Sequence, residues 1–193
     1  MADMISEEQG RVLLKMARTS IGRKLGLDAN ETLEEGRPLD SGFLDQKRGL
    51  FVTLHKDGKL RGCIGNIEPV KILAHGICDN AVSAAFDDNR FTPLSADEFS
   101  RVDIEISLLS LPEKLEYTDG NDLQAKLVPR RDGVIVEKGG RRATFLPQVW
   151  DQLPRSQEFL RHLCAKAGLA SNAWEKEGVS VYTYQVESFG ELS

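Results

Sequence analysis

The chain has 193 residues, of which 40% are hydrophobic and 28% charged, and its formal net charge at pH 7 is −5. That length fits one domain that buries a core without disulfides or metals. A general nucleic-acid-binding protein needs a basic surface to neutralise phosphates, so the negative charge argues against that class. The arginines at the one local basic cluster fit solvated loop and hairpin charges better than a nucleic-acid patch; they are Arg130, Arg131, Arg141 and Arg142.

The cysteines and the N-terminal residues indicate the cellular compartment of the protein. Cys63, Cys78 and Cys164 are odd in number and include no CxxC pair, which is typical of reduced thiols in a reducing compartment. The first eight residues are acidic and lack the features of a signal peptide. No apolar run reaches the roughly 18 residues that a membrane span needs. We therefore expect a cytoplasmic protein that does not enter a membrane.

The first predicted element is a helix that starts at a capping box. Ser6 is its N-cap and Gln9 reaches back to it. Apolar residues then recur at helical spacing until Gly26 ends the run. Residues 28–48 mix Gly, Pro, Asp and Glu without periodicity, so we expect a long loop with at most a short helical turn.

A β-hairpin is predicted over residues 49–65. Two extended segments flank the dipeptide Asp57-Gly58, which is typical of a two-residue hairpin turn. In that register Val52 faces Cys63, and His55 lies on the opposite face, where it cannot act on the thiol. A three-residue turn would shift the pairing by one residue and bring His55 and Cys63 together.

The remaining elements alternate between helices and strands. Pro69 is predicted to open a helix that ends near Phe86, and residues 102–108 alternate as a half-buried strand. Strands clustered in hairpins, with helices between and after them, indicate an α+β fold with a mixed or largely antiparallel sheet and flanking helices. The other predicted elements are a hairpin at 134–146, a helix at 156–167 capped by Ser156 and a strand at 179–186, and the apolar stripe of the second helix is Val70, Leu73, Ala74, Ile77, Ala81, Ala84 and Ala85.

The run Leu60-Arg61-Gly62-Cys63-Ile64-Gly65 is the strongest candidate for a functional site. Side chains two apart on a strand share a face, so Arg61 and Cys63 are expected to point the same way. A guanidinium beside a thiol favours the reactive thiolate. Glycine weakens a strand unless something approaches the backbone closely, and two glycines flank this thiol. The alternative is that Cys63 is a small buried core residue, and the spacing leaves both interpretations open.

Charged residues elsewhere are candidates for the surroundings of this site. We expect Glu105 or Asp88 to lie close to Arg61 and to fix its guanidinium. Asp103 shares the polar face of its strand with Glu105. Such pairs tie loops to a core more often than they perform acid–base chemistry.

The sequence assigns no metal and no cofactor. His75 and Cys78 are three residues apart on a predicted helix, but no second ligand pair supports a metal site there. His162 lies off the apolar stripe of its helix and is expected at the surface. The dinucleotide pattern GxGxxG is absent. Gly62 and Gly65 match the GxxG loop of nucleotide-clamping KH domains, but they lie in a strand rather than between two helices.

Several of these segments together resemble the AMMECR-type domain family, whose prokaryotic members are called AmmeMemoRadiSam system protein A. They follow one another in the family's order and span nearly the whole chain. The six-residue run around Cys63 is highly specific, and the run that ends at Trp150 supports it. The matching segments are Phe51-Val52-Thr53-Leu54, Leu60-Arg61-Gly62-Cys63-Ile64-Gly65, Asn80-Ala81 with Ala84-Ala85-Phe86, Asp88-Asn89-Arg90-Phe91 with Pro93-Leu94, Glu105-Ile106-Ser107, Ala143-Thr144-Phe145-Leu146-Pro147-Gln148-Val149-Trp150, and Leu163-Cys164 with Lys166-Ala167-Gly168-Leu169.

The resemblance implies a single α+β domain over residues 1–193, with a larger and a smaller lobe and the cysteine run near the cleft between them. It also implies that the chain works with a Memo-like protein and a radical SAM enzyme. It assigns no catalytic role to any residue. The candidate catalytic residues are Cys63 and Arg61, and the candidate binding residues are Gly62, Gly65, Asp88, Arg90 and Glu105, with Thr144, Pro147 and Gln148 as another wall.

Three functions are consistent with these observations. In the first, the chain is an enzyme or an enzyme's partner subunit, in which Arg61 activates Cys63 or binds an anionic substrate. In the second, it is an adaptor that binds a protein or a nucleotide without chemistry of its own. In the third, which the charge disfavours, it binds RNA or another nucleic acid.

Overall fold

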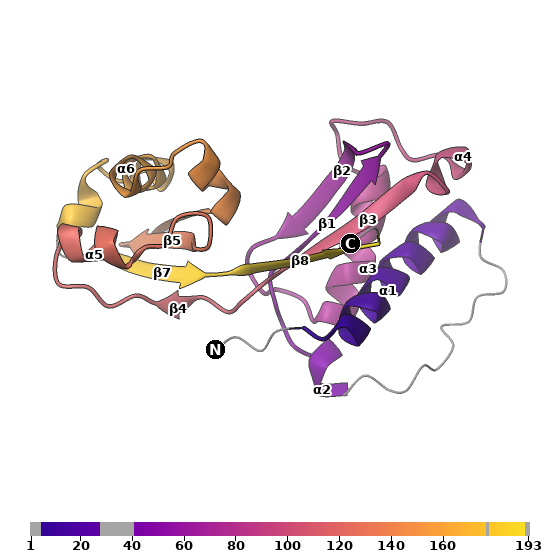
Figure 1. Ribbon diagram of the computed structural model, residues 1–193, viewed down its shortest axis with the longest axis horizontal. Helices are drawn as coiled ribbons and strands as arrows, with labels where there is room; N and C mark the ends of the chain where they lie inside the picture. Colours follow the sequence, from indigo (N-terminus) through magenta and orange to yellow (C-terminus); the bar gives the residue numbers. More distant parts are fainter. Residues whose placement is uncertain (1–4, 28–40, 177, 192–193) are drawn as a thin grey trace. The chain divides into compact units, whose positions relative to one another are not determined.

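The computed structural model describes residues 5–27, 41–176 and 178–191, and it divides into two compact units (Figure 1). The first unit consists of Met1–Leu109 with Glu187–Ser193, and the second of Ser110–Val186. Each unit holds one four-stranded sheet, and the strand pairs with a described register are antiparallel. The predicted α+β class is confirmed.

The sheet of the first unit has the strand order β2-β1-β3-β8. It is built from the predicted first hairpin, the predicted strand at 102–108 and a strand near the C-terminus that the sequence did not reveal. The elements of this unit are α1 (Glu7–Leu25), α2 (Ser41–Leu44), β1 (Leu50–Lys56), β2 (Lys59–Asn66), α3 (Leu73–Phe86), α4 (Ala96–Phe99), β3 (Val102–Leu109) and β8 (Val186–Gly190).

Helix α1 has the predicted boundaries and the predicted caps. The Ser6 side chain accepts a hydrogen bond from the backbone N–H of Gln9, and the Gln9 side chain accepts one from the Ser6 N–H. Gly26 ends the helix with a φ of 73°, a left-handed conformation that glycine adopts without strain. Of the predicted loop at 28–48, residues 28–40 lie outside the described residues, and α2 is the expected short helical turn.

Helix α3 begins four residues later than predicted. Ile72 is extended and forms an isolated bridge with Lys47, and the Leu73 N–H donates to the Gln46 carbonyl. These bonds hold the chain extended until Leu73, so Pro69 does not open the helix. Val70 was predicted on the buried stripe, but it is 61% exposed.

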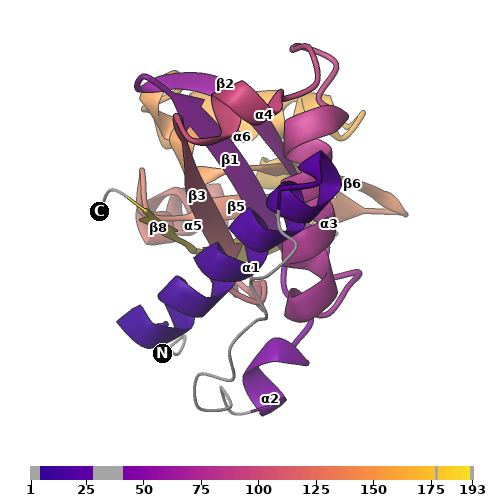
Figure 2. The ribbon, with the colours of Figure 1, turned by 90° about the vertical axis from the view of Figure 1, so that its right-hand side faces the viewer.

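Helices α1 and α3 pack side by side on one face of the first sheet (Figure 2). Alternate residues of β1 and β3 point into this core, which is why Val52, Leu54, Ile104 and Ile106 are almost fully buried. The residues of β1 and β3 that alternate with these, such as Thr53 and Glu105, point to the opposite face of the sheet. Among the described residues, the helices with the main contacts to this sheet are α1, which contacts β3, and α3, which contacts β1 and β2.

The sheet of the second unit has the strand order β4-β7-β5-β6. Its core is centred on Trp150, which stacks on Phe159 with ring centroids 3.8 Å apart and donates its indole N–H to the Asp132 carbonyl at 2.7 Å. The elements of this unit are β4 (Glu113–Lys114), α5 (Gly120–Lys126), β5 (Gly133–Lys138), β6 (Arg141–Phe145), the 3-10 helix η1 (Pro147–Asp151), α6 (Ser156–Lys166), the 3-10 helix η2 (Ala173–Glu175) and β7 (Ser180–Tyr184).

The predicted last strand is in fact two strands that belong to different sheets. β7 ends at Tyr184 in the second sheet, and β8 starts at Val186 in the first. Between them the Gln185 N–H donates to the Ser110 hydroxyl, and the Ser110 N–H donates to the Gln185 carbonyl. The alternating pattern runs through this junction unchanged, so it carries no sign of the break. The prediction that Ser156 caps α6 is wrong, because Ser156 is the first residue of the helix and Arg155 occupies the N-cap position.

Within the described part of the chain, no helix has the length and apolar content needed to span a membrane.

Candidate functional site

The first hairpin carries a β-bulge at Arg61. Near the tip the pairing is the one expected for a two-residue turn, with His55 opposite Leu60. Arg61 is then an extra residue on β2, and beyond it the register has shifted so that Thr53 lies opposite Cys63. An extra residue of this kind leaves the following side chains on the other face of the strand.

The bulge changes which residues surround the thiol. Thr53 and His55 alternate with the buried residues of β1, so they lie on the face away from α1 and α3. Cys63 lies opposite Thr53 and therefore shares this face, with His55 as a diagonal neighbour. The prediction that His55 and Cys63 lie on opposite faces is wrong. The bulge has the effect that a three-residue turn would have had.

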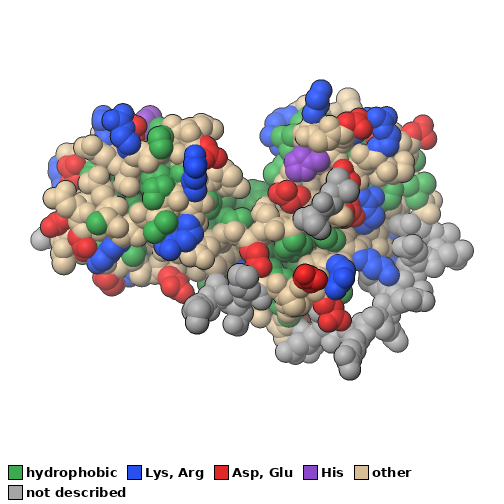
Figure 3. All heavy atoms as spheres, in the orientation of Figure 1, with side chains coloured by type: hydrophobic (Ala, Val, Ile, Leu, Met, Phe, Trp, Pro, Cys, Tyr) green, Lys and Arg blue, Asp and Glu red, His purple; other side chains and the backbone are tan. Residues whose placement is uncertain are grey.

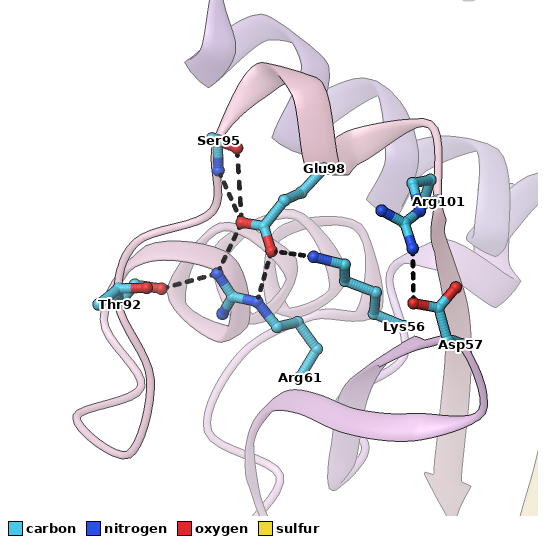
Figure 4. Close-up of polar contacts among 7 residues, drawn as sticks. All are labelled: Lys56, Asp57, Arg61, Thr92, Ser95, Glu98 and Arg101. Atoms are coloured by element: carbon cyan, nitrogen blue, oxygen red, sulfur yellow. Dashed lines mark hydrogen bonds and ion pairs between the residues drawn. The ribbon is translucent and has the colours of Figure 1, made fainter.

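Arg61 points away from Cys63 and into a polar cluster on the helix-covered side. Its Nη2 lies 3.0 Å from a carboxylate oxygen of Glu98 and donates to the Thr92 carbonyl at 2.9 Å (Figure 4). The Nζ of Lys56 lies 2.6 Å from the other oxygen of Glu98. The Arg61 side chain is only 11% exposed. The prediction that Arg61 and Cys63 point the same way is therefore wrong.

The carboxylate beside Arg61 belongs to Glu98, whereas Glu105 or Asp88 had been predicted there. Neither Asp88 nor Glu105 contacts Arg61 among the described interactions; Glu98, from the short helix α4, does. Hydrogen bonds, first of all the one from Arg61, lower the pKa of Glu98 from 4.5 to about 2. Ser95 and Glu98 have the spacing of a capping box, and this signal was available in the sequence.

The two glycines beside Cys63 make room for the protein's own chain. A Cβ atom on Gly62 would overlap the carbonyl oxygen of Ala84, at the end of α3. A Cβ atom on Gly65 would come within 2.5 Å of the Phe51 ring. A close approach to the backbone was predicted from these glycines, and helix α3 and Phe51 make it.

Asp88 and Arg90 contact Cys63 through its backbone. The Cys63 N–H donates to the Asp88 carboxylate at 2.9 Å, and Arg90 Nη2 donates to the Cys63 carbonyl at 3.4 Å. The hydrogen bonds from the Arg90 guanidinium, more than that from Cys63, hold the pKa of Asp88 well below its usual value despite the burial of this carboxyl. Of the candidate residues, these two are the ones brought to Cys63.

The Cys63 thiol is half-buried on the face away from the helices. The Thr53 hydroxyl donates a hydrogen bond to its sulfur at 3.3 Å. Cys164 is fully buried, and burial raises the pKa of its thiol. Cys78 is half-buried on α3.

Polar residues surround Thr53 and Cys63 on the same face. Glu105 lies opposite Thr53, and Asp103 lies opposite His55. The hydroxyls of Ser107 and Ser188 are hydrogen-bonded at 2.8 Å, which links β3 to β8. A hollow in this unit is lined by His55, Gly58, Asp103, Ile104, Glu105, Ser188, Phe189, Gly190 and Glu191. The β8 residues were missed because that strand was not predicted.

The candidate residues Thr144, Pro147 and Gln148 belong to the second unit. The Thr144 hydroxyl is hydrogen-bonded to the Tyr184 hydroxyl at 3.0 Å, and its carbonyl accepts a bond from Lys166. Pro147 is buried at the start of η1, and Gln148 is exposed. Their role as another wall of the Cys63 site stays a prediction.

No group of three or more His, Cys, Asp or Glu side chains among the described residues is arranged to hold a metal ion. His75 and His162 are both exposed. On the face drawn in Figure 3, acidic and basic side chains are interspersed over each unit rather than gathered by sign.

The structure defines a two-unit α+β protein whose most specific sequence run forms a bulged, cysteine-bearing hairpin. The chain matches the AMMECR1 family over residues 14–189. It is 40% identical over 192 residues to a protein of Methanothermobacter thermautotrophicus, covering 97% of this chain and 96% of that protein. A protein of Methanopyrus kandleri is 37% identical, with 99% and 92% covered.

A solved structure has the same fold. The crystal structure of PH0010 from Pyrococcus horikoshii superposes with a TM-score of 0.73 at 34% sequence identity, and 97% of this chain and 93% of that chain are covered. The chain belongs to the AMMECR1 family, as the resemblance of its motifs indicated.

Proposed function

We propose that this protein is an enzyme, or the partner subunit of one, and that its functional group is the thiol of Cys63. The observation that carries the proposal is that the residues of the run Leu60–Gly65 have different surroundings. Arg61 and the two glycines are used by the protein's own packing, whereas the half-buried thiol lies opposite Thr53 on the sheet face away from α1 and α3. A half-buried cysteine that belongs to neither hydrophobic core cluster is suited to chemistry or to binding.

The residues on this face suggest nucleophilic chemistry by the thiol. His55 lies diagonally across from Cys63, and Asp103 lies opposite His55 on the next strand. A thiol, a base and a carboxylate that orients the base form the usual order of a cysteine nucleophile and its helpers. No hydrogen bond joins these three side chains among the described contacts. In unliganded sites such bonds are often long and shorten when substrate binds.

Labelling of the full chain with iodoacetamide tests this proposal. We expect Cys63 to react about tenfold faster than Cys78 at pH 7, since a functional thiol must be reachable and partly ionised. Peptide mass spectrometry reads both sites in the same sample, and Cys78, also half-buried, is the matched control. A Cys63 that reacts no faster than Cys78, or a Cys63→Ser variant that fully replaces the natural protein in cells, contradicts the proposal.

A second candidate is an adaptor without chemistry of its own. The observation that favours it is the structural use of most of the run Leu60–Gly65, which leaves a polar sheet face suited to a partner. The partners proposed are a Memo-like protein and a radical SAM enzyme acting with this chain in the cytoplasm. Calorimetric titration of each purified protein into this chain tests the idea. A Thr53→Arg variant on the same face should abolish the binding, and absence of any binding heat contradicts it.

Nucleic-acid binding remains the least supported function. The net charge is −5, and charges of both signs are interspersed on the face in view. Such a surface releases few counterions, so we expect no change in fluorescence anisotropy of a labelled RNA at low salt. Salt-dependent binding would overturn this expectation.

A further inference from the structure

At Cys63, the backbone groups on the outer edge of β2 are hydrogen-bonded to side chains. β2 is the edge strand of the first sheet, so every second residue presents its N–H and C=O away from β1. At Cys63 both groups have side-chain partners. The N–H donates to Asp88 Oδ2 at 2.9 Å, and the carbonyl accepts from Arg90 Nη2 at 3.4 Å. Asp88 and Arg90 thus take the place of a neighbouring strand at this one residue.

The two partners also hold each other. Arg90 Nε donates to Asp88 Oδ1 at 2.9 Å, and Arg90 Nη2 lies 2.7 Å from Asp88 Oδ2, which is a bidentate ion pair. The Arg90 backbone N–H adds a third bond to Oδ1 at 3.1 Å. Asp88 is buried and its arginine is half-exposed. A buried carboxylate with this many donors is fixed in position, and it fixes the backbone of Cys63 in turn.

Arg90 is also the guanidinium that contacts Cys63 among the described hydrogen bonds, because its Nη2 lies 3.4 Å from the Cys63 carbonyl. Its hydrogen bond to Asp88 is the largest cause of the raised pKa of Arg90. Arg61, two residues from the thiol in sequence, has its guanidinium bound to Glu98 on the other side of the sheet.

We propose that Asp88 and Arg90 are positioning residues for Cys63: they hold its backbone at the sheet edge and balance the charge beside its thiol. Residue spacing had predicted only a guanidinium beside the thiol, and it had assigned that place to Arg61. The inference rests on the proposed function, in which Cys63 is the functional group.

The pH dependence of Cys63 alkylation in the full chain tests the inference, because the two charges act on the thiol in opposite directions. Asp88→Asn leaves the Arg90 cation unbalanced, which favours the thiolate, so the midpoint of the pH–rate profile should fall. Arg90→Gln leaves the Asp88 anion, and the midpoint should rise. Each shift should be on the order of half a pH unit, because Arg90 is partly solvated.

The double variant Asp88→Asn/Arg90→Gln should return the midpoint close to that of the unmodified chain. Titratable groups on this face include His55, Asp103 and Glu105, and they are unchanged in every variant, so they do not contribute to the differences. A purely structural role would shift both single variants in the same direction, and that result overturns the inference. Unchanged profiles in both single variants overturn it as well.

Two further variants keep the test informative if Asp88→Asn folds poorly. Arg90→Lys keeps the charge but loses the bidentate geometry, so the midpoint should stay in place while the Cys63 amide exchanges hydrogen faster. Arg101→Gln removes an exposed ion pair with Asp57 in the same unit and should alter neither reading. A displaced midpoint in Arg90→Lys, or an equally large effect of Arg101→Gln, contradicts the inference.

The inference and the proposed function fail separately. A Cys63→Ser variant that fully replaces the natural protein contradicts the function but leaves the opposite pH shifts untouched. Absent shifts together with a Cys63 that outpaces Cys78 contradict only the positioning role.

Discussion

Arg61 and Cys63 are two residues apart, yet they have opposite surroundings. Arg61 is buried on the helix-covered side of the sheet, where Glu98, Lys56 and the Thr92 carbonyl surround it. Cys63 is half-buried on the other side, with the Thr53 hydroxyl as its side-chain partner. One extra residue in β2 separates a structural ion pair from a half-buried thiol on the opposite face of the sheet. Proximity in a motif therefore does not show that two residues share a site.

The largest expected effect is that of Gly62→Ala on the structural side of this comparison. Its Cβ would overlap the Ala84 carbonyl, which is backbone and cannot rotate away. Forced overpacking of this kind should lower the free energy of unfolding by about 3 kcal/mol or more, measured by urea titration. Gly139→Ala is the control: its site is open but its φ is 57°, so the loss should be only about 1 kcal/mol. Equal losses would show that α3 tolerates the extra atom.

Glu98→Gln should have the next largest effect. It keeps the shape of the side chain but leaves the Arg61 cation, 11% exposed, without its counter-charge. The free energy of unfolding should fall by about 2 kcal/mol, since removing one partner of a largely buried pair exposes the cost of the other. The exposed pair of Arg101 and Asp57 provides the comparison, and Arg101→Gln should cost less than about 0.5 kcal/mol. A Glu98→Gln cost as small as that would show that Arg61 needs no anion.

Acid should weaken the same structural cluster. The pKa of Glu98 is about 2 in the folded chain, against 4.5 for a free side chain. Its contribution to stability is therefore complete above pH 4.5 and is lost as the pH falls toward 2. Asp88 acts in the same direction, because its folded pKa is also lowered. In urea titrations across this range, Glu98→Gln should flatten the loss of stability, and an unchanged slope would refute the assignment.

The smallest expected effect lies on the thiol side. His55→Ala should leave the free energy of unfolding within about 0.5 kcal/mol, because His55 is partly exposed and packs no core. It should slow turnover of any substrate that Cys63 attacks, if the imidazole is the base of the proposed chemistry. The measurement that needs no substrate is the pH dependence of Cys63 alkylation, which should change in His55→Ala. An unchanged profile would remove His55 from the site.

Much of the fold could be predicted because its signals are local. The capping box at Ser6, the Asp57-Gly58 turn and the alternation in β3 each depend on neighbouring residues, and each was found. The start of α3 was misplaced because a pairing with distant Lys47 holds Ile72 extended. The division of the last strand was missed because alternation continues through Gln185 while its hydrogen bonds change from one sheet to the other.

The site was harder to predict because one residue decides it. Asp88 and Arg90 were predicted to lie near the cysteine run, and both are hydrogen-bonded to the Cys63 backbone. The bulge at Arg61 follows from contacts that no local pattern records: α3 needs Gly62 beside Ala84, and α4 needs Arg61 beside Glu98. Both contacts lie where the register shifts by one residue. The side chains of β2 that follow Arg61 were therefore predicted on the wrong face of the sheet.

The most direct test of this separation is the alkylation rate of Cys63 in an Arg61→Gln chain, kept well below its unfolding transition. Because the guanidinium is bound on the other side of the sheet, its removal should leave the rate at pH 7 within about twofold of that of the unmodified chain. A tenfold or greater fall, with Cys78 unaffected, would show that Arg61 activates the thiol after all.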